Sequence, residues 1–319
     1  MDHVNFPYRS SSHLALMHVI SESGAWERQG LKVDYDKPIN RDDAHKRVIT
    51  GEVEFVSGNH VSTYAARARG DTWVYLAQTV SKNNIALVTR PDIGIDKLEN
   101  VRKRKFGSRG RHPGLNTWLY LKQHGLDVDK DDVEIVREVR DGDPSTNEAR
   151  KSMLQMVKDG DVDAAFFTQP KIEFAKRDGL KVIGLEPQPM IFFMTVSSSM
   201  KLVESRPDII DKMLKGILEG VAFFKKEKEK TIKILMDKHS KEGKLDRDAA
   251  GKLYDDIAPT LDAKLYPSMA SIHNVYQEAV RQDKDAAKID PLALWDLHFL
   301  RRIDDTGFID ALYGQKRGA

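Results

Sequence analysis

The stretch Ser23–Tyr35, with the sequence SGAWERQGLKVDY, decides the fold. Its first half continues a helix that we expect to run to about Gln29, because apolar side chains recur there on roughly one face. Gly30 stands where a helix C-cap belongs. Leu31–Tyr35 then alternates apolar and polar side chains, as a half-buried strand does. The stretch therefore predicts a helix, a turn and a strand in direct succession.

The same succession continues along the chain. Strands are predicted at residues 4–8, 53–56 and 72–78, with helices at 41–50 and 62–69 between them. A second block repeats the order, with strands at 85–89, 133–139, 164–168 and 180–185 and helices at 95–104, 115–124 and 147–158. After an apolar strand at 191–196, helices are predicted at 207–239, 246–258, 268–282 and 291–302. This order favours an α/β fold of mainly parallel sheets flanked by helices, with a helical C-terminal part.

Composition narrows the functional classes. The 319 residues are too many for one compact core and suggest two lobes. A net charge of only +2 gives no global basic field, so nucleic acid is not an expected partner. The chain has no cysteine, which excludes disulfides, thiolate zinc sites and cysteine nucleophiles. The sequence contains no run of about 18 apolar residues, so no transmembrane segment is predicted.

Short motifs point to no metal and no cofactor. The sequence has neither an H-E-x-x-H pattern nor a Gly-x-Ser-x-Gly elbow, and no Gly-Lys-Ser/Thr follows its glycine-rich loop. The first residues, Met1–Asn5, lack the basic start and apolar run of a leader. We therefore expect a cytoplasmic protein if Met1 is the native start, and a periplasmic or membrane-associated one if a leader was removed.

Four phrases carry a family resemblance. The first is the Ser23–Asp34 stretch, and the second is ITGEVEF at Ile49–Phe55. The third, VKDGDVDAA at Val157–Ala165, repeats the pattern of the second, and the fourth is DDTGFID at Asp304–Asp310. In this order the sequence resembles the substrate-binding proteins of ABC importers for nitrate, sulfonates and taurine, and the related thiamine-pyrimidine-synthase-like family.

The resemblance implies a two-lobed periplasmic-binding-protein type II fold with a ligand cleft between the lobes. Lobe one would comprise residues 1–88 and 190–319 with the C-terminal helices, and lobe two residues 89–189. The function implied is binding of a small anionic molecule, a carboxylate or sulfonate, by hinge closure, with delivery to an ABC permease as partner. Loops after strands would then face the ligand.

Lobe one offers several candidate ligand-binding residues. Arg9 could form a charge-assisted bond, and hydroxyls at a helix start suit an oxyanion. A serine before a helix is about as often a plain N-cap, and a lone histidine is more often structural. The candidates that follow predicted strands are Arg9, Ser10, Ser11, Ser12, His13, Asn59, His60, Ser62 and Gln78.

Lobe two offers a glycine-rich loop that opens a helix. Glycines let a backbone approach a ligand closely, and guanidinium groups match oxyanions. A solvated loop would look much the same. The candidates here are Ser108, Arg109, Arg111, His112 and Asn116, followed by Thr168 and Gln169 at the end of a later strand.

An enzyme on the same fold is the alternative. Relatives with this fold include an aromatic sulfinate desulfinase and a dihydroxyphthalate decarboxylase. A decarboxylase or lyase acting on an aromatic or small organic acid needs a proton donor and an anion clamp, which His60 or His112 with Arg109 could supply. The missing cysteine leaves desulfinase chemistry of the known type without its nucleophile.

Overall fold

The chain forms two compact units. The computed structural model describes residues 1–40, 43–58, 60–108, 117–130, 132–137, 151–169, 171–238 and 245–315. Unit 1 comprises Met1–Ser81 and Ile191–Ala319, and unit 2 comprises Lys82–Met190. The sequence-based division was expected at residues 88 and 190. Each boundary falls inside a strand, β4 (Trp73–Asn83) or β10 (Gln188–Ser199), so the chain passes between units without leaving extended backbone.

Unit 1 begins with the succession that the opening stretch predicts. Strand β1 (Asp2–Asn5) pairs in parallel with β2 (Leu31–Asp34). Between them lie a 3₁₀ turn, η1 (Ser11–His13), and two helices, α1 (Leu14–Glu22) and α2 (Ala25–Arg28). The single helix expected to reach Gln29 is thus wrong. Gly24 has a φ of 73°, a left-handed conformation that ends α1 and starts α2 in a new direction.

Unit 1 also contains a three-stranded sheet, in which β10 lies between two strands of the N-terminal segment. Its order is β3-β10-β4, with β3 at Val56–Ser57 and antiparallel to β10. Helix α3 (Ala44–Ile49) precedes β3, and α4 (Ser62–Ala68) follows it. Strand β3 is shorter and later than the strand expected at residues 53–56.

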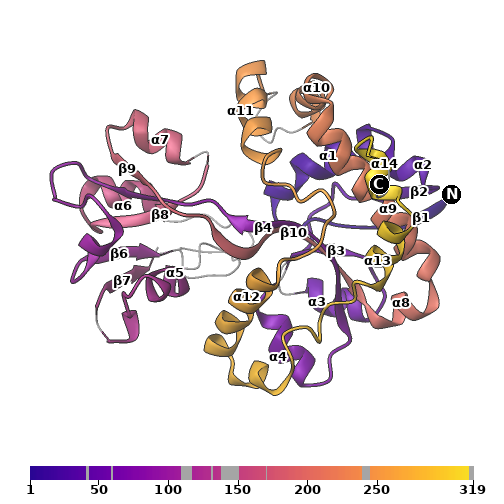
Figure 1. The fold of residues 1–319 in the computed structure, drawn as a ribbon, viewed down its shortest axis with the longest axis horizontal. Helices are drawn as coiled ribbons and strands as arrows, with labels where there is room; N and C mark the ends of the chain where they lie inside the picture. The colour runs from indigo at the N-terminus through magenta and orange to yellow at the C-terminus, as the bar shows by residue number, and fades with distance from the viewer. Residues whose placement is uncertain are drawn as a thin grey trace. The chain divides into compact units, whose positions relative to one another are not determined.

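The core of unit 1 is formed where α9 (Pro207–Lys226) packs on α1 and α2 (Figure 1). Two glycines of α9 make this packing close. A Cβ built on Gly216 would lie 2.5 Å from Cδ1 of Trp26, and one on Gly220 would lie 2.9 Å from Cα of Ile20. Glycine at both positions therefore lets the helix backbones approach each other.

The C-terminal part of unit 1 is helical, as expected. Its elements are α8 (Met200–Ser205), α10 (Lys228–Lys238), α11 (Arg247–Ile257), α12 (Met269–Gln282), η4 (Lys284–Lys288), α13 (His298–Asp305) and α14 (Phe308–Leu312). The helix expected at 291–302 is wrong over its first half. There residues 291–294 form turns, the backbone N–H of Tyr75 donates to Leu294, and the N–H of Asp296 donates to Tyr75, which holds the segment beside β4.

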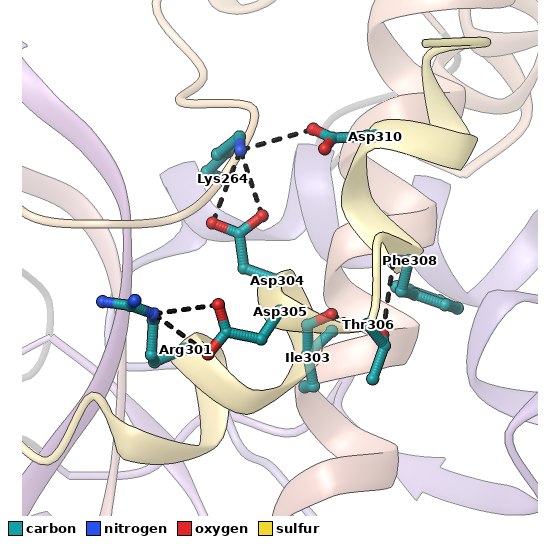
Figure 2. Close-up of polar contacts among 8 residues, drawn as sticks. All are labelled: Lys264, Arg301, Ile303, Asp304, Asp305, Thr306, Phe308 and Asp310. Atoms are coloured by element: carbon teal, nitrogen blue, oxygen red, sulfur yellow. Dashed lines mark hydrogen bonds and ion pairs between the residues drawn. The ribbon is translucent and has the colours of Figure 1, made fainter. Parts of the chain in front are cut away.

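The DDTGFID phrase forms the corner between α13 and α14. Gly307, with a φ of 78°, turns the chain, and the Thr306 hydroxyl donates to the carbonyl of Ile303 at 2.7 Å. Figure 2 shows Nζ of Lys264 between Asp304 and Asp310, at 3.0 and 3.3 Å. One lysine therefore forms ion pairs with both helices that meet at this corner.

Unit 2 is built on one five-stranded sheet with the order β7-β6-β8-β5-β9. Its strands are β5 (Ala86–Thr89), β6 (Lys105–Ser108), β7 (Glu134–Arg137), β8 (Ala164–Phe167) and β9 (Lys181–Gly184). Strand β6 is parallel to β7 and β8, whereas β5 is antiparallel to β8 and β9. The strand directions are therefore more mixed than the mainly parallel sheets expected from the sequence.

Both faces of this sheet are covered. Alternate residues of β8 belong to different apolar clusters, Ala164 and Phe166 to one and Ala165 and Phe167 to the other. Helix α5 (Thr117–Gln123) packs in the first cluster, and α6 (Met153–Asp159) and α7 (Lys171–Arg177) pack in the second. The short 3₁₀ elements are η2 (Leu98–Val101), where a helix at 95–104 was expected, and η3 (Val128–Lys130). Among the helices of the described residues, none has the length and apolar character needed to span a membrane.

Candidate functional site in unit 1

Buried polar side chains of unit 1 gather around the loop that follows β3. His13, in η1, is 5% exposed, and its Nδ1 lies 2.7 Å from Oγ of Ser57 at the end of β3. Its ring meets the ring of Phe193 edge-on, with centroids 5.4 Å apart. Two segments distant in sequence are thus joined through one histidine.

Gly58 brings a charged group to the same place. A Cβ built on Gly58 would lie 3.6 Å from Cε1 of His13 and 3.7 Å from Nη1 of Arg9. The φ of Gly58 is 82°, which side chains rarely tolerate, and its N–H donates to the carbonyl of Thr195 at 3.1 Å. A guanidinium, an imidazole and bare backbone therefore converge here.

A second buried histidine lies two residues further on. His60 is 1% exposed, and its Nε2 lies 2.7 Å from Oγ1 of Thr195 in β10. The Thr195 hydroxyl also donates to Oε1 of Gln78 in β4. Gln78 and Thr195 are both fully buried. Three strands or strand ends of unit 1 therefore share one polar network in a low-dielectric interior.

Strand β10 is strained beside this network. Phe193 has a φ of 62°, in the left-handed region that residues with a Cβ avoid. Its neighbours Phe192 and Met194 accept hydrogen bonds from the side chains of Gln78 and Thr79. Side chains of β4 thus hold the irregular backbone in place, and backbone strain of this kind clusters at functional sites.

Arg9 also acts electrostatically on a buried tyrosine. Burial raises the pKa of the Tyr75 phenol well above its usual range, and neighbouring Tyr64 adds to this, while contact with Thr63 and the positive charge of Arg9 act in the opposite direction. Tyr75 is 1% exposed and packs on Trp295, with ring centroids 4.8 Å apart. The phenol of Tyr75 therefore stays neutral at physiological pH.

The predicted site residues of unit 1 fall into two groups. Arg9, His13, His60 and Gln78 lie in or beside the buried cluster. Ser10 and Ser12 bond to each other through their hydroxyls at 2.8 Å, and His13 rather than a serine occupies the N-cap position of α1. Ser62 is exposed at the start of α4, and the backbone of Ser11 lies in η1. Asn59 lies outside the described residues.

Unit 2 contributes fewer described candidates. Ser108 ends β6, Thr168 follows β8, and the exposed Gln169 donates to Glu173 at 3.4 Å. Arg109, Arg111, His112 and Asn116 lie outside the described residues. Within the described ranges there is also no group of three or more histidine, aspartate or glutamate side chains that could hold a metal ion.

Sequence reasoning missed three members of the cluster: Ser57, Phe193 and Thr195. The available signal for Thr195 was its position as a polar residue within the apolar run Ile191–Val196. A polar residue at a buried strand position requires a hydrogen-bond partner, and here it has two. Nothing in the local sequence marks the positive φ of Phe193.

The fold and this cluster define an α/β protein of the periplasmic-binding type. The chain belongs to the NMT1/THI5-like family, whose model matches residues 12–231. The family resemblance that the four phrases carry is thereby confirmed. No protein among the curated sequences matches the chain.

Solved structures show the same fold at low sequence identity. The periplasmic sulfonate-binding protein SsuA from Methylobacillus flagellatus KT is 16% identical, with a TM-score of 0.69 over 96% of this chain and 95% of that one. The aliphatic sulphonate binding protein SsuA from Escherichia coli is 15% identical, with a TM-score of 0.64 over 90% and 91%. A variant of the enzyme DszB in complex with biphenyl-2-sulfinic acid is 17% identical, with a TM-score of 0.61 over 96% and 99%. The periplasmic-binding fold expected from the sequence is confirmed.

Proposed function

We propose that this chain is the solute-binding component of an ABC importer and that it binds a small anion, a sulfonate or a carboxylate. The observation that carries the proposal is the convergence of Arg9, His13 and backbone at Gly58 beside buried His60. A guanidinium next to imidazoles in a buried setting suits an oxyanion, because charge-assisted hydrogen bonds strengthen away from water.

The comparisons support the class of ligand and the partner. Two neighbours of the same fold are named as sulfonate-binding proteins, one of them as part of a sulfonate ABC transporter. Under this proposal the chain works in the periplasm or at the membrane surface and passes its ligand to a permease. Arg109, Arg111 and His112 stay sequence-based predictions for further ligand contacts.

Calorimetric titration tests the proposal. The purified chain is titrated with a panel of alkanesulfonates, aromatic sulfonates and carboxylates, with amines of similar size as a counter-set. We expect anions to bind and amines not to bind. Arg9→Ala should weaken the best anion by about ten- to a hundredfold, because losing a charge-assisted bond costs about 1.5–3 kcal/mol.

Arg47→Ala is the matched control. Arg47 also loses one positive charge on substitution, but its Nε contacts Glu52 at the surface. It should leave anion affinity unchanged. Equal binding by wild type and Arg9→Ala, or preference for amines, would refute the proposal. Consumption of a bound anion during incubation, followed by NMR, would instead favour an enzyme.

A further inference from the structure

The side-chain amide of Gln78 has one permitted orientation. Its Nε2 donates to the carbonyl oxygen of Val80 at 2.6 Å and to that of Phe192. A reversed amide would place its oxygen against two carbonyl oxygens, with no proton between them. Oε1 of Gln78 therefore faces Thr195 as an acceptor.

This orientation fixes the proton of the neighbouring hydroxyl. Oε1 of Gln78 carries no proton, so the Thr195 hydroxyl must donate to it. A hydroxyl has a single proton to give. Nε2 of His60, 2.7 Å from the same Thr195 oxygen, must then be the donor in that contact.

We propose that Gln78 and Thr195 are positioning residues that hold the neutral ring of His60 in the tautomer with its proton on Nε2. All three side chains are at most 1% exposed, so water does not compete for these bonds. Nδ1 of neutral His60 is consequently an acceptor. Gln78, predicted from sequence as a ligand contact, acts through His60 in this arrangement.

Nitrogen NMR of the imidazole rings tests the tautomer without any ligand. Long-range proton–nitrogen correlation at about pH 8, where imidazoles are mainly neutral, is recorded on wild type and on His60→Gln to assign the His60 signals. We expect a protonated Nε2 and an unprotonated Nδ1. The opposite tautomer in wild type overturns the proposal.

Variants of Thr195 test the positioning role. Thr195→Ser keeps the hydroxyl and should keep the wild-type pattern, whereas Thr195→Val should give a mixture of tautomers. Thr89→Val, a buried threonine of unit 2, is the matched control and should leave His60 unchanged. An unchanged single tautomer in Thr195→Val overturns the proposal. If that variant does not fold, wild type and Thr195→Ser still decide it.

Discussion

Two short segments of the molecule, Gly51–Glu54 in unit 1 and Gly160–Asp163 in unit 2, share one sequence pattern. Each follows a helix, and the glycines have φ values of 79° and 82°. Each places a valine in the core, 4% and 0% exposed. In each, the last acid accepts the backbone N–H of a residue on a neighbouring strand, Asn5 at 2.8 Å or Lys105 at 3.0 Å. The pattern thus performs the same local task twice.

The two copies differ in what holds them. In unit 2, Nη1 of Arg90 donates to the carbonyls of Val157 and Val162 at 2.8 and 3.0 Å, and Nη2 reaches Asp163 at 3.4 Å. In unit 1, Glu54 takes a further bond from the side-chain amide of Asn5 at 3.1 Å. A guanidinium therefore caps the end of α6 and reaches the last acid in unit 2, whereas the last acid of the unit 1 copy, Glu54, is held by uncharged donors of Asn5. The shared Gly-acid-Val-acid pattern is therefore compatible with different hydrogen-bond donors around it.

Removing the guanidinium should produce the largest difference between the copies. Arg90→Ala removes the donor from two carbonyls, that of Val157 in α6 and that of Val162 just after it, and should cost about 2–3 kcal/mol of unfolding free energy. Arg47→Ala, at the corresponding helix of unit 1, should cost less than about 0.5 kcal/mol, because its ion pair is exposed. Urea unfolding combined with hydrogen exchange of peptides from each unit measures both. Equal losses would remove the distinction.

Alanine at the two glycines should give an intermediate effect. Gly51→Ala meets no atom within 4 Å and should cost only left-handed strain, about 1 kcal/mol. Gly160→Ala brings Cβ within 3.3 Å of Nη1 of Arg90, so it should cost more. In an Arg90→Ala background this excess should vanish, which a double-mutant cycle detects. If Gly160→Ala still costs more than Gly51→Ala in that background, the contact with Arg90 is not the cause of the difference.

Neutralising the acids should have the smallest effect. Glu54→Gln and Asp163→Asn both keep an oxygen that can accept the backbone N–H. Each should cost under about 1 kcal/mol, with Asp163→Asn the larger because it also weakens the contact with Arg90. Thermal unfolding at matched pH measures the pair, and a larger loss for Glu54→Gln would reverse the ranking.

Much of the fold could be predicted from the sequence because its signals are local. The left-handed glycines at positions 30, 51 and 160 end helices where the pattern places them. The prediction of a helix from residue 291 was wrong for a nonlocal reason. The apolar spacing there suits a helix, but residues 291–294 form turns, and hydrogen bonds to Tyr75 fix Leu294 and Asp296 beside β4. Tyr75 is more than two hundred positions away in sequence.

The candidate site was partly predictable for the same reason. His13 and His60 follow strands, and that position alone nominated them. Thr195 is 135 residues from His60 and 117 from Gln78 along the chain, so only the folded sheet reveals that they meet. Long-range pairing of this kind leaves no periodic trace in sequence.

The insertion of unit 2 into unit 1 also governs how the protein is made. Strand β3 pairs with residues 196 and 197, so it leaves the ribosome long before its partner is synthesised. Residues 82–190 form a contiguous unit that can fold while the first 81 residues still wait. Trp26 likewise lacks its contact with Gly216 until α9 emerges. The N-terminal segment therefore completes its packing only after the last part of β10 and α9 have been synthesised.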